Sequence, residues 1–202
     1  MSPSRIAGIL SGVVGLVVFL TIHHVWITPI WFILPVGLLI ACLGGLATGW
    51  AYEEIQPGLP PRAWPALVVF GLIAVILAPA LILAQLLPPV VDVPAGKLAA
   101  TTSELTVRFV ILFVTAAVVG ALTGWLLGRT WRGAVAMATA GLVFALGPGH
   151  NIPFLGNTPG VGKELALLGA IALTSSVVLV EASARLARRQ TRQTLWPRTP
   201  ID

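Results

Sequence analysis

Hydrophobic residues follow one another in long runs along most of this 202-residue chain, and short polar stretches separate the runs. A helix needs about 20 mostly apolar residues to cross a hydrocarbon core of roughly 30 Å. The runs are continuously apolar, whereas the strands of a membrane barrel would alternate over short segments. The pattern therefore predicts an all-α, polytopic transmembrane helix bundle. Its six predicted spans lie at about residues 6–26, 30–52, 65–87, 105–128, 133–149 and 164–183.

These spans divide the chain into a transmembrane domain, residues 1–183, and a basic cytoplasmic tail, residues 184–202, which we expect to be disordered. The fifth span is short, so five spans plus a re-entrant segment are the main alternative. The first apolar run follows Arg5 as in a signal peptide, but no small-x-small cleavage site precedes "HHVWI". We therefore expect this run to be retained as the first helix.

Composition and charge agree with a membrane protein and predict its orientation. Hydrophobic residues make up 57% of the chain and charged residues only 9%, far below the usual quarter. With the N-terminus in the cytoplasm, nine of the 12 Lys and Arg residues fall on the cytoplasmic side. This bias predicts cytoplasmic termini, and we assume a prokaryotic-type plasma membrane. Because the positive charges are concentrated in the tail, the net charge of +5 does not indicate a nucleic-acid partner.

Short sequence echoes suggest an internal repeat. "GGLATGW" (44–50) resembles "GALTGW" (120–125), and "GLVVFLTIHH" (15–24) resembles "GLVFALGPGH" (141–150). Three tandem helical hairpins would explain both echoes, although short apolar matches also arise by chance.

Glycines recur four residues apart in several spans. They are Gly8 and Gly12, Gly45 and Gly49, and the series Gly120, Gly124 and Gly128. Such spacing lets helix backbones approach closely in a membrane. It predicts tight helix contacts and is also compatible with a homo- or hetero-oligomer that forms through the glycine faces.

All three histidines lie at the expected outer ends of spans. His23 and His24 end the first span and His150 ends the fifth. If these spans are neighbours, the imidazoles could hold a transition metal such as copper, zinc, nickel or cobalt. The alternative is that the histidines only sit at the headgroup level, where amphipathic side chains are tolerated.

The predicted interior is rich in hydroxyls and has no ionisable group at the expected midplane, which argues against a proton-coupled pump or a carrier of charged solutes. Thr174, Ser175 and Ser176, in the middle of the sixth span, could line a path for a small neutral solute. The alternative is that these hydroxyls bond between helices or to their own backbone.

Two further segments have a chemical interpretation. The tail begins with four arginines, Arg185, Arg188, Arg189 and Arg192, which we expect to bind anionic lipid headgroups. The stretch "GNTPGVGKEL" (156–165) resembles a phosphate-binding loop but has Asn157 at the first glycine position and Glu164 after Lys163. We therefore expect no nucleotide cofactor.

Three functions are compatible with these features. The first is binding or transport of a small solute or transition-metal ion through the outer histidines. The second is a non-catalytic membrane subunit or scaffold of a larger complex, which the glycine spacings and the missing midplane charges favour. A membrane enzyme with a histidine-based outer site comes third, although no hydrolase motif is present.

Overall fold

The computed structural model of the chain describes residues 1–22, 30–58, 71, 73, 78, 102–147 and 161–195. Within these ranges the secondary structure is helical, without strands. The helices are α1 (Pro3–Ile22), α2 (Ile30–Ile55), α4 (Thr102–Gly128), α5 (Trp131–Leu146) and α6 (Val161–Leu195), and a short 3-10 helix, η2 (Gln56–Gly58), follows α2. The predicted all-α class is thus confirmed for the described part of the chain.

Four of the described helices, α1, α2, α4 and α6, are long and apolar enough to cross a membrane. Helix α5 has only 16 residues, which span about 24 Å at 1.5 Å per residue. That length is short of a hydrocarbon core of roughly 30 Å. The third predicted span, residues 65–87, lies almost wholly outside the described residues. The structure thus supports a membrane protein with four candidate spanning helices.

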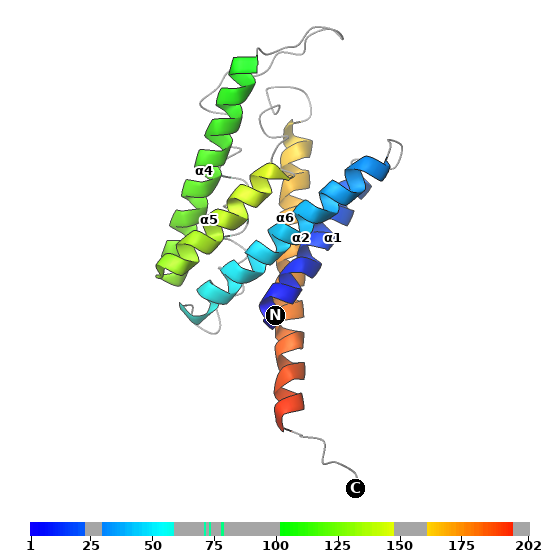
Figure 1. The fold of residues 1–202 in the computed structure, drawn as a ribbon, viewed down its shortest axis with the longest axis vertical. Coiled ribbons are helices and arrows are strands. Elements are labelled where there is room, and N and C mark those ends of the chain that lie inside the picture. Colours follow the sequence, from blue (N-terminus) through cyan, green and yellow to red (C-terminus); the bar gives the residue numbers. More distant parts are fainter. Residues whose placement is uncertain are drawn as a thin grey trace.

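The helices form a bundle in which α1 packs along α2, α4 along α5, α2 also against α5, and α1 also against α6 (Figure 1). The start of α1, the end of α2 and the turn from α4 to α5 lie together, and we call this the N-terminal end of the bundle. Helix α5 packs mainly against α4 and α2. The predicted third hairpin, made of the fifth and sixth spans, is therefore not a closely packed pair among the described helices.

Helices α1 and α2 touch through their backbones because glycines face each other at the crossing. A Cβ atom on Gly8 would meet the carbonyl oxygen of Gly45 and lie 2.8 Å from the Cα of Gly49. One turn further along α1, a Cβ on Gly12 would meet the carbonyl oxygen of Ala41. The predicted glycine contacts therefore form between these two helices of the same chain.

The same kind of contact joins α4 to α5. A Cβ atom on Gly120 would lie 2.6 Å from the carbonyl oxygen of Met137, and one on Gly124 would meet the carbonyl oxygen of Gly133. Both glycines are buried within the chain. Contacts inside one chain therefore cover Gly120 and Gly124.

The turn between α4 and α5 fixes this pair in its antiparallel arrangement. Arg129 follows the end of α4 with a φ of 52°, a left-handed conformation that commonly ends helices. Thr130 then caps α5, and its hydroxyl accepts a hydrogen bond of 3.1 Å from the backbone N–H of Gly133. A turn of two residues therefore places α5 directly beside α4.

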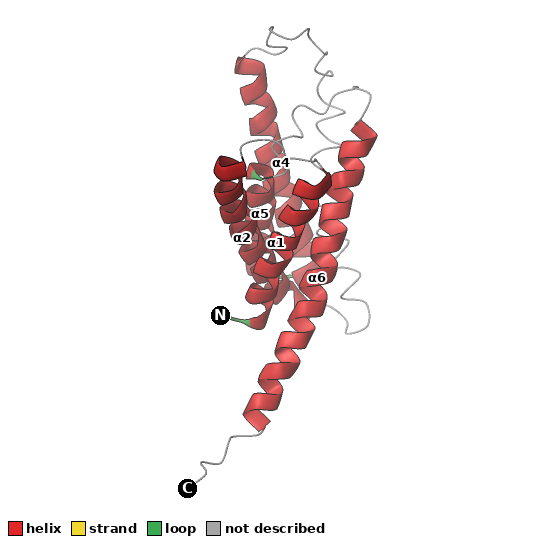
Figure 2. Ribbon diagram, turned by 90° about the vertical axis from the view of Figure 1, so that its right-hand side faces the viewer, coloured by secondary structure: helices red, strands yellow, loops and turns green. Residues whose placement is uncertain are grey.

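Helix α6 is longer than the sequence pattern predicts. It continues to Leu195, twelve residues past the expected end at 183, so the first part of the tail expected to be disordered is helical. Residues 184–195 include good helix formers such as Ala, Leu, Arg and Gln, and no Gly or Pro occurs before Pro197. This part of α6 extends beyond the N-terminal end of the bundle (Figure 2), where residues 187–193 are exposed.

We expect Gly8→Ala to destabilise the bundle by about 1–3 kcal/mol, because the added methyl group meets backbone atoms that no side-chain rotation can move away. Gly169→Ala is the matched control, since a Cβ at Gly169 would find nothing within 4 Å. Thermal unfolding in one detergent should show a lower midpoint for Gly8→Ala only. Equal midpoints for the two variants would contradict the close contact between α1 and α2.

Candidate functional site

The N-terminal end of the bundle holds a compact apolar core. Residues of four helices contribute to it, and we call it the N-terminal core cluster: Ala7, Ala51, Tyr52, Ile55, Ala136, Met137 and Leu179. Ser183, one turn beyond Leu179 on α6, is 5% exposed, and its Oγ has no hydrogen-bond partner in the described part of the chain. A buried hydroxyl without a partner costs about 1–3 kcal/mol.

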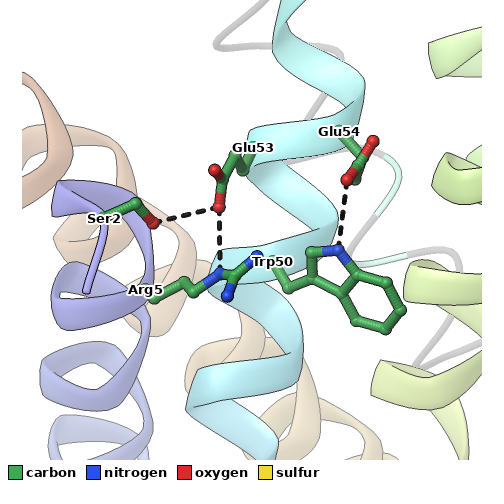
Figure 3. A network of polar contacts seen from close by, with 5 residues as sticks. All are labelled: Ser2, Arg5, Trp50, Glu53 and Glu54. Atoms are coloured by element: carbon green, nitrogen blue, oxygen red, sulfur yellow. Dashed lines mark hydrogen bonds and ion pairs between the residues drawn. The ribbon is translucent and has the colours of Figure 1, made fainter.

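A polar network covers the ends of α1 and α2 next to this core (Figure 3). The Oε2 atom of Glu53 accepts hydrogen bonds of 3.0 Å from the Ser2 hydroxyl and from Nε of Arg5. One residue further along α2, Glu54 accepts a bond of 3.2 Å from the indole N–H of Trp50. The Arg5 and Glu53 side chains are 41% and 38% exposed. Solvent screens such a pair, so we interpret it as a modest tie between two helix ends.

Sequence reasoning did not single out this network, although a signal for it was present. Arg5 precedes the first apolar run, and Glu53 and Glu54 end the second. If the two runs form a hairpin, these opposite charges must lie at the same level. Oppositely charged residues at paired span ends would therefore have predicted the contact.

The interior hydroxyls of the described helices bond mainly to their own backbones. The hydroxyls of Ser11, Thr115 and Ser176 donate to carbonyl oxygens three or four residues earlier, at 2.6–2.7 Å for the shortest contact of each. The Thr48 hydroxyl donates to the carbonyl oxygen of Gly44 in the same way. A hydroxyl bonded in this manner is satisfied within its helix and needs neither water nor solute.

The predicted solute path lies where α6 faces its neighbours. Ser176 is 1% exposed, and its hydroxyl donates to the carbonyl oxygen of Ala172. The Oγ of Ser175 lies 2.7 Å from the position that a Cβ on Gly15 of α1 would occupy. Thr174 is partly exposed. Ser175 and Ser176 thus lie at helix contacts.

The three histidines proposed as metal ligands, His23, His24 and His150, lie outside the described residues. Helix α1 ends at Ile22, directly before His23. Gly147, three residues before His150, follows the end of α5. It packs against Ile40, since a Cβ on Gly147 would lie 2.8 Å from Cγ2 of that residue. Among the described residues, no group of three or more His, Cys, Asp or Glu side chains could hold a metal ion. The metal site stays a prediction.

The four arginines proposed to bind lipid are on the exposed part of α6: Arg185, Arg188, Arg189 and Arg192. Nε of Arg185 forms an ion pair of 2.8 Å with Glu181, four residues earlier. Both side chains of this pair are more than half exposed, at 72% and 59%, so the pair contributes little to stability. The arginines are held on a regular helix.

Comparison of the chain with protein-family models, curated proteins and solved structures finds no match.

We expect Gly15→Ala to destabilise the protein by about 1 kcal/mol, at the low end of overpacking effects, because the Ser175 hydroxyl can rotate away at some cost. Adding Ser175→Ala should restore most of the loss, since the Cβ atom of Ser175 lies 4.0 Å from the new methyl group. Thermal midpoints of the two single variants and the double variant test this. The same loss with and without the Ser175 hydroxyl would show that this residue does not lie at the contact.

Proposed function

We propose that the chain is a non-catalytic membrane subunit or scaffold, which packs against the helices of a partner protein in the bilayer. The close packing of the described helices is the observation that supports this most directly. Glycine contacts bring α1 onto α2 and α4 onto α5, and interior hydroxyls such as those of Ser11 and Ser176 bond to their own helices. A carrier would need polar groups that face a path, as ion and solute pathways in membranes do.

The exposed face of α4 is the surface that we propose for the partner. Four valines spaced three or four residues apart are 51–55% exposed on it: Val107, Val110, Val114 and Val118. Valine has one strongly preferred rotamer in a helix, so it loses little conformational entropy when another helix covers it. The exposed apolar residues of α2 are mainly leucines, such as Leu39, which is 60% exposed. Leucine loses more side-chain conformational entropy than valine when another helix covers it.

The proposal includes the finer predictions of topology and location. Residues 65–87 supply the third of six spans, and both termini face the cytoplasm from a prokaryotic-type plasma membrane. Support comes from positive charges of separate segments that gather at the N-terminal end of the bundle, namely Arg5 of α1, Arg129 and Arg132 at the α4–α5 turn, and the arginines of α6. Short cytoplasmic loops carry such an excess of Lys and Arg.

Transport or binding of a metal ion through His23, His24 and His150 is the competing proposal. It predicts about one transition-metal ion for each purified chain, and loss of this metal when the three histidines are replaced by alanine. Metal at that ratio with that dependence would replace the scaffold proposal.

Photo-crosslinking tests the scaffold proposal directly. A photoreactive residue at Val114 should give one adduct of defined mass in native membranes, and the same partner should co-purify at a fixed ratio. The control is the same residue at Leu39, which is equally accessible on α2 and should give lipid adducts only. If neither position captures a protein, or if both give the same mixture of proteins, the proposal is wrong.

A further inference from the structure

The projecting part of α6 carries a positively charged face. Four exposed arginines make up this face, which we call the arginine stripe: Arg185, Arg188, Arg189 and Arg192. At ~100° per residue, their positions fall within an arc of ~100° around the helix. The positions of the buried residues Leu179 and Ser183 lie ~130° and ~170° from the middle of this arc, on the opposite side of the helix. The stripe therefore points away from the bundle.

The arginine stripe continues a ridge that is apolar further back along α6. Leu173 and Val177 are 50% and 55% exposed, and Glu181, Arg185 and Arg189 follow at steps of four residues. Each step turns the position by only ~40°, because a helical turn takes 3.6 residues. Leu173 and Val177 belong to a candidate membrane span, so in a bilayer this part of the ridge contacts acyl chains. The same ridge then reaches the headgroups of those lipids.

The direction of α6 also favours contact between the arginines and the membrane. Side chains on a helix tilt toward its N-terminus, and the apolar part of the candidate span, which runs from Ala166 to Gln193, lies on the N-terminal side of the stripe. The guanidinium groups can therefore reach back toward the bilayer. Arg185 lies about 12 Å along the axis from Val177, and Arg192 about 22 Å. The first three arginines are thus closer to the headgroups than Arg192.

We propose that the arginine stripe binds the phosphate-bearing headgroups of anionic phospholipids in the leaflet at the N-terminal end of the bundle. Guanidinium groups donate paired hydrogen bonds that match phosphate geometry. An acidic protein would satisfy the same charge, but the continuity with the apolar ridge favours lipid. This inference does not depend on the function proposed above.

A rearranged variant separates the position of the arginines from the net charge. It exchanges each of two arginines with its neighbour and so keeps composition and charge: Ala187→Arg, Arg188→Ala, Arg189→Gln and Gln190→Arg. All four positions are exposed, so the fold should persist, which circular dichroism checks. A second variant, Arg188→Gln with Arg189→Gln, removes both charges. Full-length protein is reconstituted in phosphatidylcholine with spin-labelled phosphatidylglycerol or phosphatidylcholine, and the immobilised fraction of each label is compared.

We expect wild-type protein to prefer phosphatidylglycerol to phosphatidylcholine. Each arginine near the surface should raise the relative association constant for phosphatidylglycerol roughly five-fold. Both variants should lower this preference at least about five-fold, and added salt should lower it for the wild type. If the rearranged variant keeps the full preference for phosphatidylglycerol, net charge alone explains lipid binding. The stripe is then not a specific site. The proposal would also be overturned if the wild type showed no lipid preference and an acidic protein co-purified only with the intact stripe. That result would favour a protein partner.

Discussion

Direct contact between helix backbones is the constraint on which the rest of this structure depends. In a bilayer, lipid tails are as apolar as the side chains they touch, so close packing and not burial from water brings helices together. Glycine allows this at the crossing of α1 with α2, where Gly8 faces Gly45, and at the contact of α4 with α5, where Gly124 faces Gly133. Even one methyl group at Gly8 would occupy the space of a backbone atom.

This packing has consequences for function. Helices in contact through their backbones leave little room between them, and the hydroxyls on them, such as those of Ser11 and Ser176, bond to their own carbonyl groups. The charged groups and the exposed apolar face discussed above lie outside the described interior. The Arg5–Glu53 pair ties the ends of α1 and α2, and α4 presents an apolar face. The end of α6, which carries exposed arginines, extends beyond the bundle (Figure 2). The partner and lipid contacts that we propose both lie on these surfaces.

Sequence periodicity was sufficient for the helical class and for the glycine contacts, because both follow from local spacing. It did not predict the residues in contact, because the four-residue spacing at Gly8 does not identify Gly45 as its partner. Arg5 likewise meets Glu53 only after the hairpin has formed. The end of α6 was predicted too early, because a run of arginines resembles a solvated tail although Ala, Leu, Arg and Gln also favour a helix. The metal prediction for His23, His24 and His150 concerns residues outside those described.

A double-mutant cycle in lipid bicelles tests the backbone contact most directly. Gly8→Ala and Gly45→Ala remove the same contact, so the free energy of unfolding of the double variant should differ from the sum of the single effects by at least about 0.5 kcal/mol. Gly8→Ala combined with Gly124→Ala, which affects the other helix pair, should be additive within about 0.5 kcal/mol. Additivity in both pairs would contradict the account, because Gly8 and Gly45 would then not share a contact.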